Sequence, residues 1–192
     1  VKKDQILFEI DPVDASSELN RLAQRLAALD LKEIRLRAEI NGEEFSVPTD
    51  LSSRSPMVSL TEQSLFTARR SELSGELAVL AQQLRQRNQD LRAAESMVGT
   101  AKRTGGFLEE EIAVVKPLVK DSIAPATRLL ELQRQLEQIR GEQDRAGTAI
   151  EQARSGMKEL ETEVENAKAS YRLRAMDELN TVVAEQSELR EA

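Results

Sequence analysis

The chain has 192 residues, of which 32% are charged and only 3% are aromatic, and it contains no Cys, His or Trp. Without His and Cys it lacks the commonest metal ligands, the usual general base and the thiol nucleophile, which argues against catalytic residues, a metal site or a cofactor. The formal charge of −7 argues against a nucleic-acid partner, because phosphate binding needs a clustered excess of Lys and Arg.

The remaining composition, rich in Leu, Ala, Glu, Gln and Arg, favours long amphipathic helices. Near the start, Ile6, Phe8 and Ile10 alternate along residues 5–11 and predict a short strand. Asp11 and Pro12 then suit the N-cap and the first position of a helix. This helix is expected over residues 14–41, with an apolar stripe formed by Leu19, Leu22, Leu26, Leu29, Leu36 and Ile40.

Residues 42–56 contain two prolines and several serines without a sustained period, which predicts a loop with at most one short turn. Beyond it, residues 57–192 show apolar residues in heptads, interrupted near 116–127. The first arm carries Phe66, Leu73, Leu80, Ala94, Ala101, Leu108 and Val115, alternating with Leu77, Leu84, Leu91, Val98, Ile112 and Val119. The second carries Leu132, Ile139, Ala146, Ala153, Leu160 and Ala167, alternating with Leu129, Leu136, Ile150, Met157, Val164 and Tyr171.

These series predict an antiparallel coiled-coil hairpin. If facing residues have numbers that sum to 244, every apolar series meets another, and the turn is centred on Ser122 with Pro125 near the start of the returning helix. The fold class is therefore mainly α, a long helical hairpin with an additional N-terminal helix. That helix could pack along the hairpin or stand apart from it. We favour packing against the half of the hairpin far from the turn, because the loop after Gly42 is long enough to return it there.

Two arginines interrupt the seam. Arg70 and Arg87 occupy positions at which apolar residues otherwise recur. Each could mark an oligomer contact or fix the register, or it could extend past the seam into solvent.

The turn is unusually apolar for the end of a hairpin. Its candidate partner-binding residues are Lys116, Leu118, Val119, Lys120, Asp121, Ser122, Ile123, Ala124 and Pro125. An exposed apolar turn flanked by charges suggests a docking surface. The alternative is that the same residues only close the hairpin.

Two motifs carry a resemblance to a known family. V-K-K-D-Q-I-L-F-E-I-D-P at residues 1–12, followed by a long helical insertion, is similar to the first half of the split lipoyl-like (biotinyl) domain of HlyD-family membrane fusion proteins. P-L-V-K-D-S-I-A-P at 117–125 and L-L-E-L-Q-R-Q-L-E-Q-I-R-G at 129–141 resemble the turn and return helix of its type I secretion members.

The resemblance implies a half lipoyl-like β segment at residues 1–13 and a periplasmic adaptor of type I protein secretion. Such an adaptor bridges an inner-membrane ABC transporter and a TolC-like outer-membrane channel, meets the secreted protein and assembles as a homo-oligomeric ring. The resemblance also implies an inner-membrane anchor outside these 192 residues. The chain starts at Val1 without an initiator Met, as expected of a fragment.

The sequence departs from the family pattern at two places. Asp4 stands where the lipoyl strand usually has Gly. The Arg-x3-Leu-x6-Ser pattern of drug-efflux adaptors is not satisfied around Leu118, which favours type I secretion over drug efflux. A coiled-coil scaffold or tether outside secretion is the other alternative.

Overall fold

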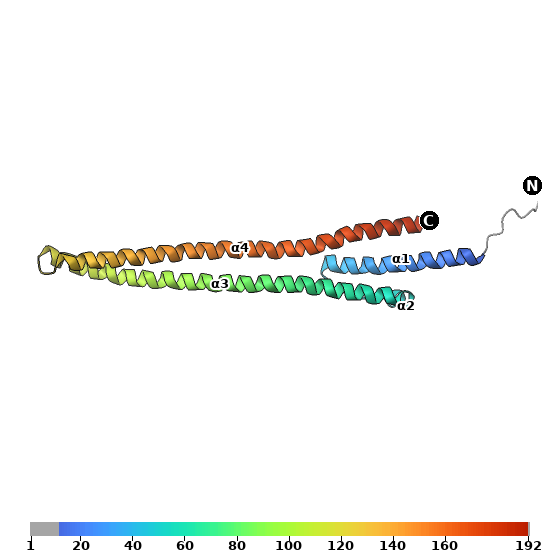
Figure 1. Cartoon of the computed structure of the whole chain (residues 1–192), viewed down its shortest axis with the longest axis horizontal. Coiled ribbons are helices and arrows are strands. Elements are labelled where there is room, and N and C mark those ends of the chain that lie inside the picture. Colours follow the sequence, from blue (N-terminus) through green and yellow to red (C-terminus); the bar gives the residue numbers. More distant parts are fainter. Residues whose placement is uncertain (1–11, 192) are drawn as a thin grey trace, which may run out of the picture. The chain divides into compact units, whose positions relative to one another are not determined.

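The computed structural model describes the backbone of residues 12–191 and the side chains of residues 16–191. Four helices follow in order: α1 (Pro12–Asn41), α2 (Thr49–Arg54), α3 (Pro56–Lys120) and α4 (Ala126–Glu191) (Figure 1). The described residues contain no strand. The strand predicted for residues 5–11 lies outside them. Of the lipoyl-like segment expected at residues 1–13, only Pro12 and Val13 are described, and they belong to α1.

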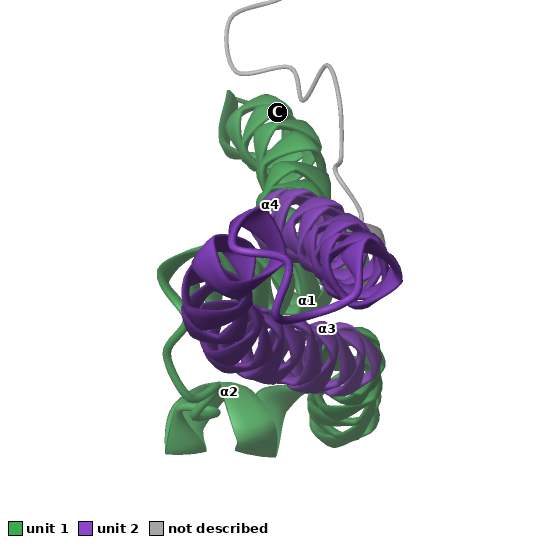
Figure 2. Ribbon diagram, turned by 90° about the vertical axis from the view of Figure 1, so that its left-hand side faces the viewer, with its two compact units in different colours: residues 1–76, 166–192 green, residues 77–165 purple. Residues whose placement is uncertain are grey.

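The chain divides into two compact units (Figure 2). Unit 1 comprises residues 1–76 and 166–192, and unit 2 comprises residues 77–165. Both long helices contribute to both units. Within the described part of the chain, no helix is both long and apolar enough to cross a membrane.

Unit 2 is the turn-proximal part of the predicted antiparallel hairpin. Every predicted apolar seam position between residues 77 and 165 is buried or half-buried, whereas Arg87 is exposed. The expected facing pair Gly105 and Ile139 meets as the sum of 244 requires, because a Cβ added to Gly105 would lie 3.7 Å from Ile139 Cγ2. At about 1.5 Å per residue, the 44 residues of α3 in this unit span about 65 Å.

Interhelical ion pairs flank this seam on one face. Arg140 donates to Glu109 at 3.0 Å, and Arg154 lies 3.8 Å from Glu95. All four side chains are about half exposed, so each pair contributes little to stability. The apolar seam therefore determines the register of the hairpin.

Unit 1 is built around α1, which buries two faces. Leu29 and Leu36 pack with Ala175 and Val182 of α4 in one apolar cluster. The predicted packing of the first helix against the hairpin base is therefore confirmed. Leu19 is an exception to the predicted stripe: it is 67% exposed, and Figure 1 shows the first turns of α1 extending past the end of α4.

The second face of α1 covers the segment that the sequence suggests to be a loop. Ala27 and Leu31 bury Leu51 of α2. Ala38 packs with Phe45 and Phe66, whose ring centroids lie 5.7 Å apart. Residues 42–56 therefore form an anchored connection with a six-residue helix inside it, and sequence periodicity misses this because only isolated residues carry the packing.

A buried ion cluster joins the three long helices within unit 1. The Arg35 side chain on α1 has no exposed surface and contacts Glu39 and Glu62, with Glu178 of α4 at 3.5 Å. Arg69 on α3 completes the cluster by contacting Glu178 at 2.6 Å and Glu39 at 3.3 Å. Every buried charge is thus paired, as burial of an ion requires.

Carboxylates of this region are held ionised. Burial opposes ionisation of Glu178, but the hydrogen bond and charge of Arg69, aided by Arg35, outweigh it and lower the pKa of Glu178. On the next helical turns, buried Gln186 donates to Asp30 at 3.0 Å and to Glu33 at 2.9 Å. The hydrogen bond from Gln186 lowers the pKa of Glu33.

Removing the central charge should loosen α1. We expect Arg35→Ala to cost about 3–5 kcal/mol, because it leaves Glu62 without its cation and buried Glu39 with only the contact to Arg69. Hydrogen exchange of the α1 amides and thermal unfolding measure this loss. Arg37→Ala is the matched control: its side chain is 60% exposed and pairs with Glu33, so it should cost less than about 1 kcal/mol. Equal effects of both variants would contradict the role of the cluster.

Acid should loosen the same contacts. Because the folded-state pKa values of Glu33 and Glu178 lie below the ordinary value of 4.5, the stability that they contribute is complete above that pH and is lost as the pH falls through the lowered values. Hydrogen exchange of α1 should accelerate relative to the unit 2 seam below about pH 4.5. Glu178→Gln should reduce this pH dependence, and an unchanged profile would count against the assignment.

Candidate functional site at the hairpin turn

The predicted partner-binding residues form one continuous structure at the end of unit 2. Helix α3 ends at Lys120 and α4 begins at Ala126, so residues 121–125 form the turn around Ser122. Within the predicted set only Val119 and Ala124 are half-buried; the other seven residues are exposed. Their role as a docking surface stays a prediction.

The turn has the hydrogen bonds of a Schellman motif, in which a left-handed residue ends a helix. The Ile123 amide donates to the Leu118 carbonyl at 2.8 Å, and the Ser122 amide donates to the Val119 carbonyl at 3.1 Å. Ser122 has a φ of 57°, in the left-handed region that Gly usually occupies. The backbone of the turn is therefore well defined before any partner binds.

The two central apolar side chains occupy the positions that often touch in this motif. Leu118 is 37% exposed, so the hairpin itself covers part of its side chain, whereas Ile123 is 72% exposed. Closing the turn therefore leaves most of the Ile123 surface uncovered. Burial of such a side chain by a partner would contribute about 1.5–3 kcal/mol.

Sequence reasoning missed two neighbouring apolar residues. Val114 on α3 is 64% exposed and Leu130 on α4 is 53% exposed, each one or two helical turns from the turn residues. Leu130 lies next to the seam residue Leu129, and Val114 lies next to Val115. The heptad places both outside the seam, so their exposure could have been read from their register.

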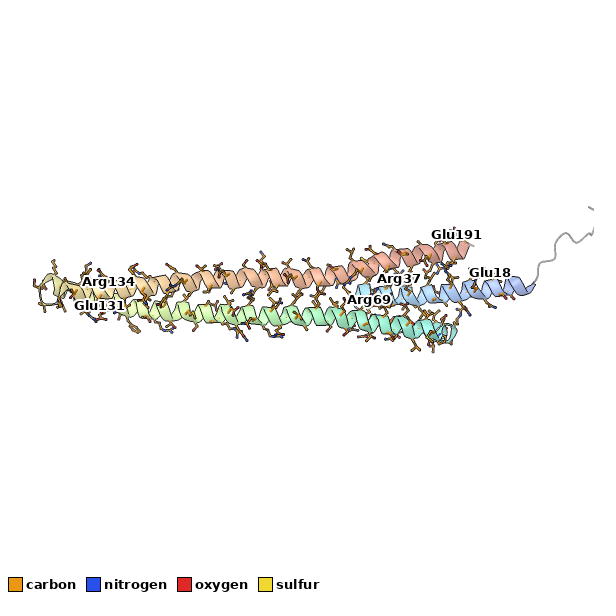
Figure 3. All side chains as sticks on the ribbon, in the orientation of Figure 1. Glu18, Arg37, Arg69, Glu131, Arg134 and Glu191 are labelled. Atoms are coloured by element: carbon orange, nitrogen blue, oxygen red, sulfur yellow. The ribbon has the colours of Figure 1, made fainter. Side chains whose placement is uncertain are left out.

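Charged residues frame the turn. Lys116, Lys120 and Asp121 are exposed, and Arg128 in the first turn of α4 forms an ion pair with Glu111 of α3 (Figure 3 shows the side chains of this end, with Glu131 and Arg134 labelled). The pair links the two arms beside the apolar residues. The arrangement can bind a surface by contact, with an apolar centre and a charged rim.

The two seam arginines prove to have local roles. Arg70 lies over the Phe66 ring, 5.9 Å from its centroid, and pairs with Glu44. Arg87 lies across Gly156, where an added Cβ would come within 3.4 Å of its Nε. Both side chains leave the seam, as their length allows.

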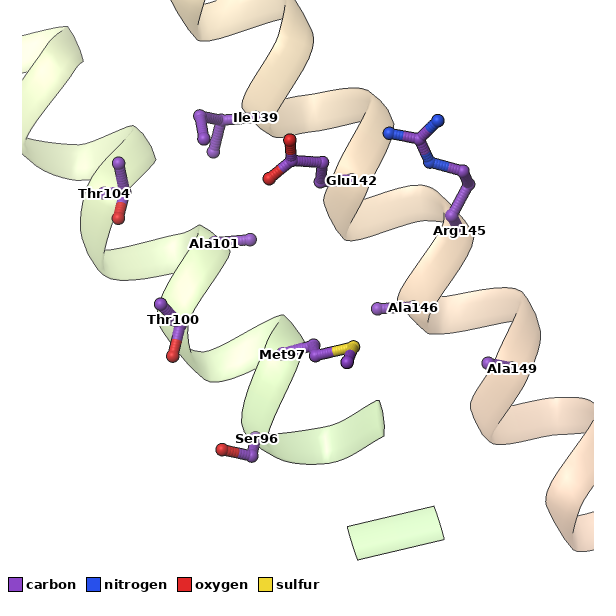
Figure 4. Close-up of a pocket in the computed structure, with 10 residues that line it drawn as sticks. All are labelled: Ser96, Met97, Thr100, Ala101, Thr104, Ile139, Glu142, Arg145, Ala146 and Ala149. Carbon is purple, nitrogen blue, oxygen red and sulfur yellow. The ribbon is translucent and has the colours of Figure 1, made fainter. Parts of the chain in front are cut away.

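Unit 2 also contains an open groove of about 580 Å³ between α3 and α4 (Figure 4). Its lining includes Met97, Thr100 and Thr104 of α3 and Ala146 and Ala149 of α4. The groove follows from small residues in and beside the seam. Within the described residues no group of three or more acidic side chains is placed to hold a metal ion.

Comparison with known proteins gives one consistent family. A family model described as "AprE, long alpha-helical hairpin" matches residues 15–192. Type I secretion system membrane fusion protein PrsE of Rhizobium meliloti (strain 1021) is 26% identical over 197 aligned positions, covering all of this chain and 45% of PrsE. Alkaline protease secretion protein AprE of Pseudomonas aeruginosa is 23% identical over 178 residues, covering 90% of this chain and 41% of AprE. The chain thus spans less than half the length of these curated relatives.

A solved structure has the same fold. The soluble domain of LipC, described as a membrane fusion protein of a type I secretion system, matches 98% of this chain and 91% of the LipC chain with a TM-score of 0.85. Because only 22% of residues are identical, this likeness concerns the fold.

The left-handed serine gives a direct test of the turn geometry. Ser122→Gly should raise the free energy of unfolding by about 1 kcal/mol, because a residue with a Cβ is disfavoured by about 1–2 kcal/mol in this conformation. Urea unfolding measures the change. Gly42→Ala is the reverse control, since Gly42 has a φ of 74° and its replacement should destabilise the chain. A neutral or destabilising Ser122→Gly would argue against the Schellman turn.

Proposed function

Because the chain belongs to the family of AprE-type long α-helical hairpins, we propose that it is the hairpin portion of a periplasmic adaptor in type I protein secretion. The observation that carries the proposal is the match of this family over nearly the whole chain, with relatives named as type I secretion proteins. The adaptor bridges an inner-membrane ABC transporter and a TolC-like outer-membrane channel. It carries no chemistry of its own.

The proposed mechanism is mechanical. The apolar seam keeps the two arms of unit 2 in one register, so the turn is presented at a fixed distance along the hairpin. The exposed Ile123 and the partly exposed Leu118 then dock on the channel, with the charged residues around them at the rim. An exposed apolar surface at a well-defined turn supports this assignment.

The remaining parts of the proposal concern the whole protein. Copies stand side by side as a homo-oligomeric ring, and the secreted protein passes through the conduit that the hairpins surround. An inner-membrane anchor lies outside these 192 residues, and residues 1–13 supply half of a lipoyl-like domain. These assignments follow the resemblance of residues 1–12 and 117–141 to the type I secretion adaptors.

The docking role is tested by the double variant Leu118→Glu, Ile123→Glu in the full-length protein. Loss of the Ile123 contact, at about 1.5–3 kcal/mol, and of the smaller contact of the partly covered Leu118 should lower the affinity for the channel by roughly 10-fold or more. Secretion and co-purification of the channel should fall accordingly. Circular dichroism should show unchanged helicity, because Ile123 is 72% exposed in the hairpin itself.

Met57→Glu is the matched control. Met57 is 73% exposed but lies in the first turn of α3, in the other unit from the turn. It should leave secretion and channel binding intact. Normal secretion by a correctly assembled Leu118→Glu, Ile123→Glu variant would refute the docking role of the turn.

A further inference from the structure

Helix α3 of unit 2 carries an uncharged row on its water-facing side. The row repeats every seven residues, and we call it the α3 stripe: Val79, Gln86, Ala93, Thr100, Phe107 and Val114. All six residues are exposed, with Phe107 at 69%, Val114 at 64% and Val79 at 56%. In a chain with 32% charged residues, this side of a two-helix hairpin would ordinarily carry Lys and Glu.

Helix α4 presents a different outward row, at the heptad position opposite the seam. We call it the α4 face: Arg134, Gly141, Thr148, Ser155 and Thr162. Glu137 and Asp144 lie about one helical turn before and after Gly141. Gly141 has no packing reason within the chain, because an added Cβ would meet nothing within 4 Å, although glycine costs a helix about 1 kcal/mol relative to Ala.

The two arms of unit 2 carry opposite net charge. Residues 79–108 of α3 contain five basic and two acidic side chains, a net charge of +3. The level-matched residues 136–165 of α4 contain four basic and eight acidic side chains, a net charge of −4. Contact between two α3 arms or two α4 arms would oppose like charges, whereas α3 against α4 of another copy is complementary.

We propose that a second copy of this chain docks on the α3 stripe through its α4 face, so that each copy uses two different surfaces. Such a heterologous contact propagates from copy to copy and closes into a ring when the rotation allows. The side-by-side placement of copies is taken from the proposed function. The new part of the inference is which two surfaces of the hairpin meet.

In a ring whose rotation axis is parallel to the hairpins, equivalent residues of all copies lie at the same level along that axis. A residue of α3 therefore meets the α4 residue of the next copy whose number completes the sum of 244. Glu110, one turn from Phe107 on the outward side of α3, then faces Arg134 of the next copy. Neither Glu110 nor Arg134 forms an ion pair within residues 16–191, and the contact between copies supplies one.

Arg103, the next charged residue on this side of α3 away from the turn, fits the same register. Arg103 reaches the height of Gly141 in the next copy, where Glu137 and Asp144 lie one helical turn on either side. Arg103 and Glu110, the two charged residues of α3 in unit 2 at the heptad position opposite the seam, are thus each matched by opposite charge. Parallel pairing of α3 with α3 would instead oppose Arg103 to Arg103 and Glu110 to Glu110.

Cysteine cross-linking tests the proposal, because the chain has no Cys of its own. Ser96 and Thr148 are exposed, complete the sum of 244 and occupy the heptad position opposite the seam on their two arms, which places them beyond disulfide reach within one hairpin. Oxidation of the Ser96→Cys, Thr148→Cys variant at rising protein concentration should give a ladder of covalent dimers, trimers and larger species. Each single-cysteine variant should remain monomeric on a denaturing gel.

Two results would overturn the proposal. Covalent dimers from either single variant at the efficiency of the double variant would mean isologous contact. A double variant that forms no cross-linked species at any concentration would mean that the α3 stripe and the α4 face do not meet.

A charge exchange tests the register. In the cross-linking background, Glu110→Arg alone should lower the ladder yield several-fold, because it opposes Arg134, and adding Arg134→Glu should restore it. Absence of rescue contradicts the predicted pairing. The readout does not use secretion, so intact cross-linking in the Leu118→Glu, Ile123→Glu variant separates failure of turn docking from failure of this contact.

Discussion

The apolar seam of the antiparallel hairpin is the constraint on which the rest of the structure depends. Residues of α3 and α4 meet when their numbers sum to 244, and the contact of Gly105 with Ile139 follows this rule. Since the seam uses two of every seven positions, it fixes which residues face outward on each arm. The turn, the ion pairs beside the seam and the α3 stripe are all consequences of that register.

The base of the hairpin is stabilised by a different interaction. In unit 1, Arg35 of α1 is buried among carboxylates that come from three helices, with Glu62 from α3 and Glu178 from α4. Removing one member of such a cluster costs more than the cluster itself contributes, because the remaining charges are left unpaired. The cluster therefore specifies how α1 sits in unit 1 more than it adds to stability.

The hairpin was predictable from the sequence because heptad spacing is a local signal repeated many times. The turn centre at Ser122 followed from the same spacing, and α3 and α4 indeed end and begin on either side of it. Helix α2 and the pairing of Phe45 with Phe66 were not predictable, since each depends on one or two residues meeting a distant helix. The buried role of Arg35 was not predictable either, because its partners Glu62 and Glu178 are 27 and 143 residues away.

The turn is where the structure and the proposed function meet. Its backbone is fixed by hydrogen bonds to the Leu118 and Val119 carbonyls, while Ile123 remains largely uncovered. A photo-cross-linking amino acid at position 123 of the full-length adaptor, irradiated in secreting cells, tests the docking most directly. If the turn docks on the channel, position 123 gives a covalent adduct with the outer-membrane channel and position 57 gives none. Adducts of equal yield from both positions, or no channel adduct from position 123, would contradict it.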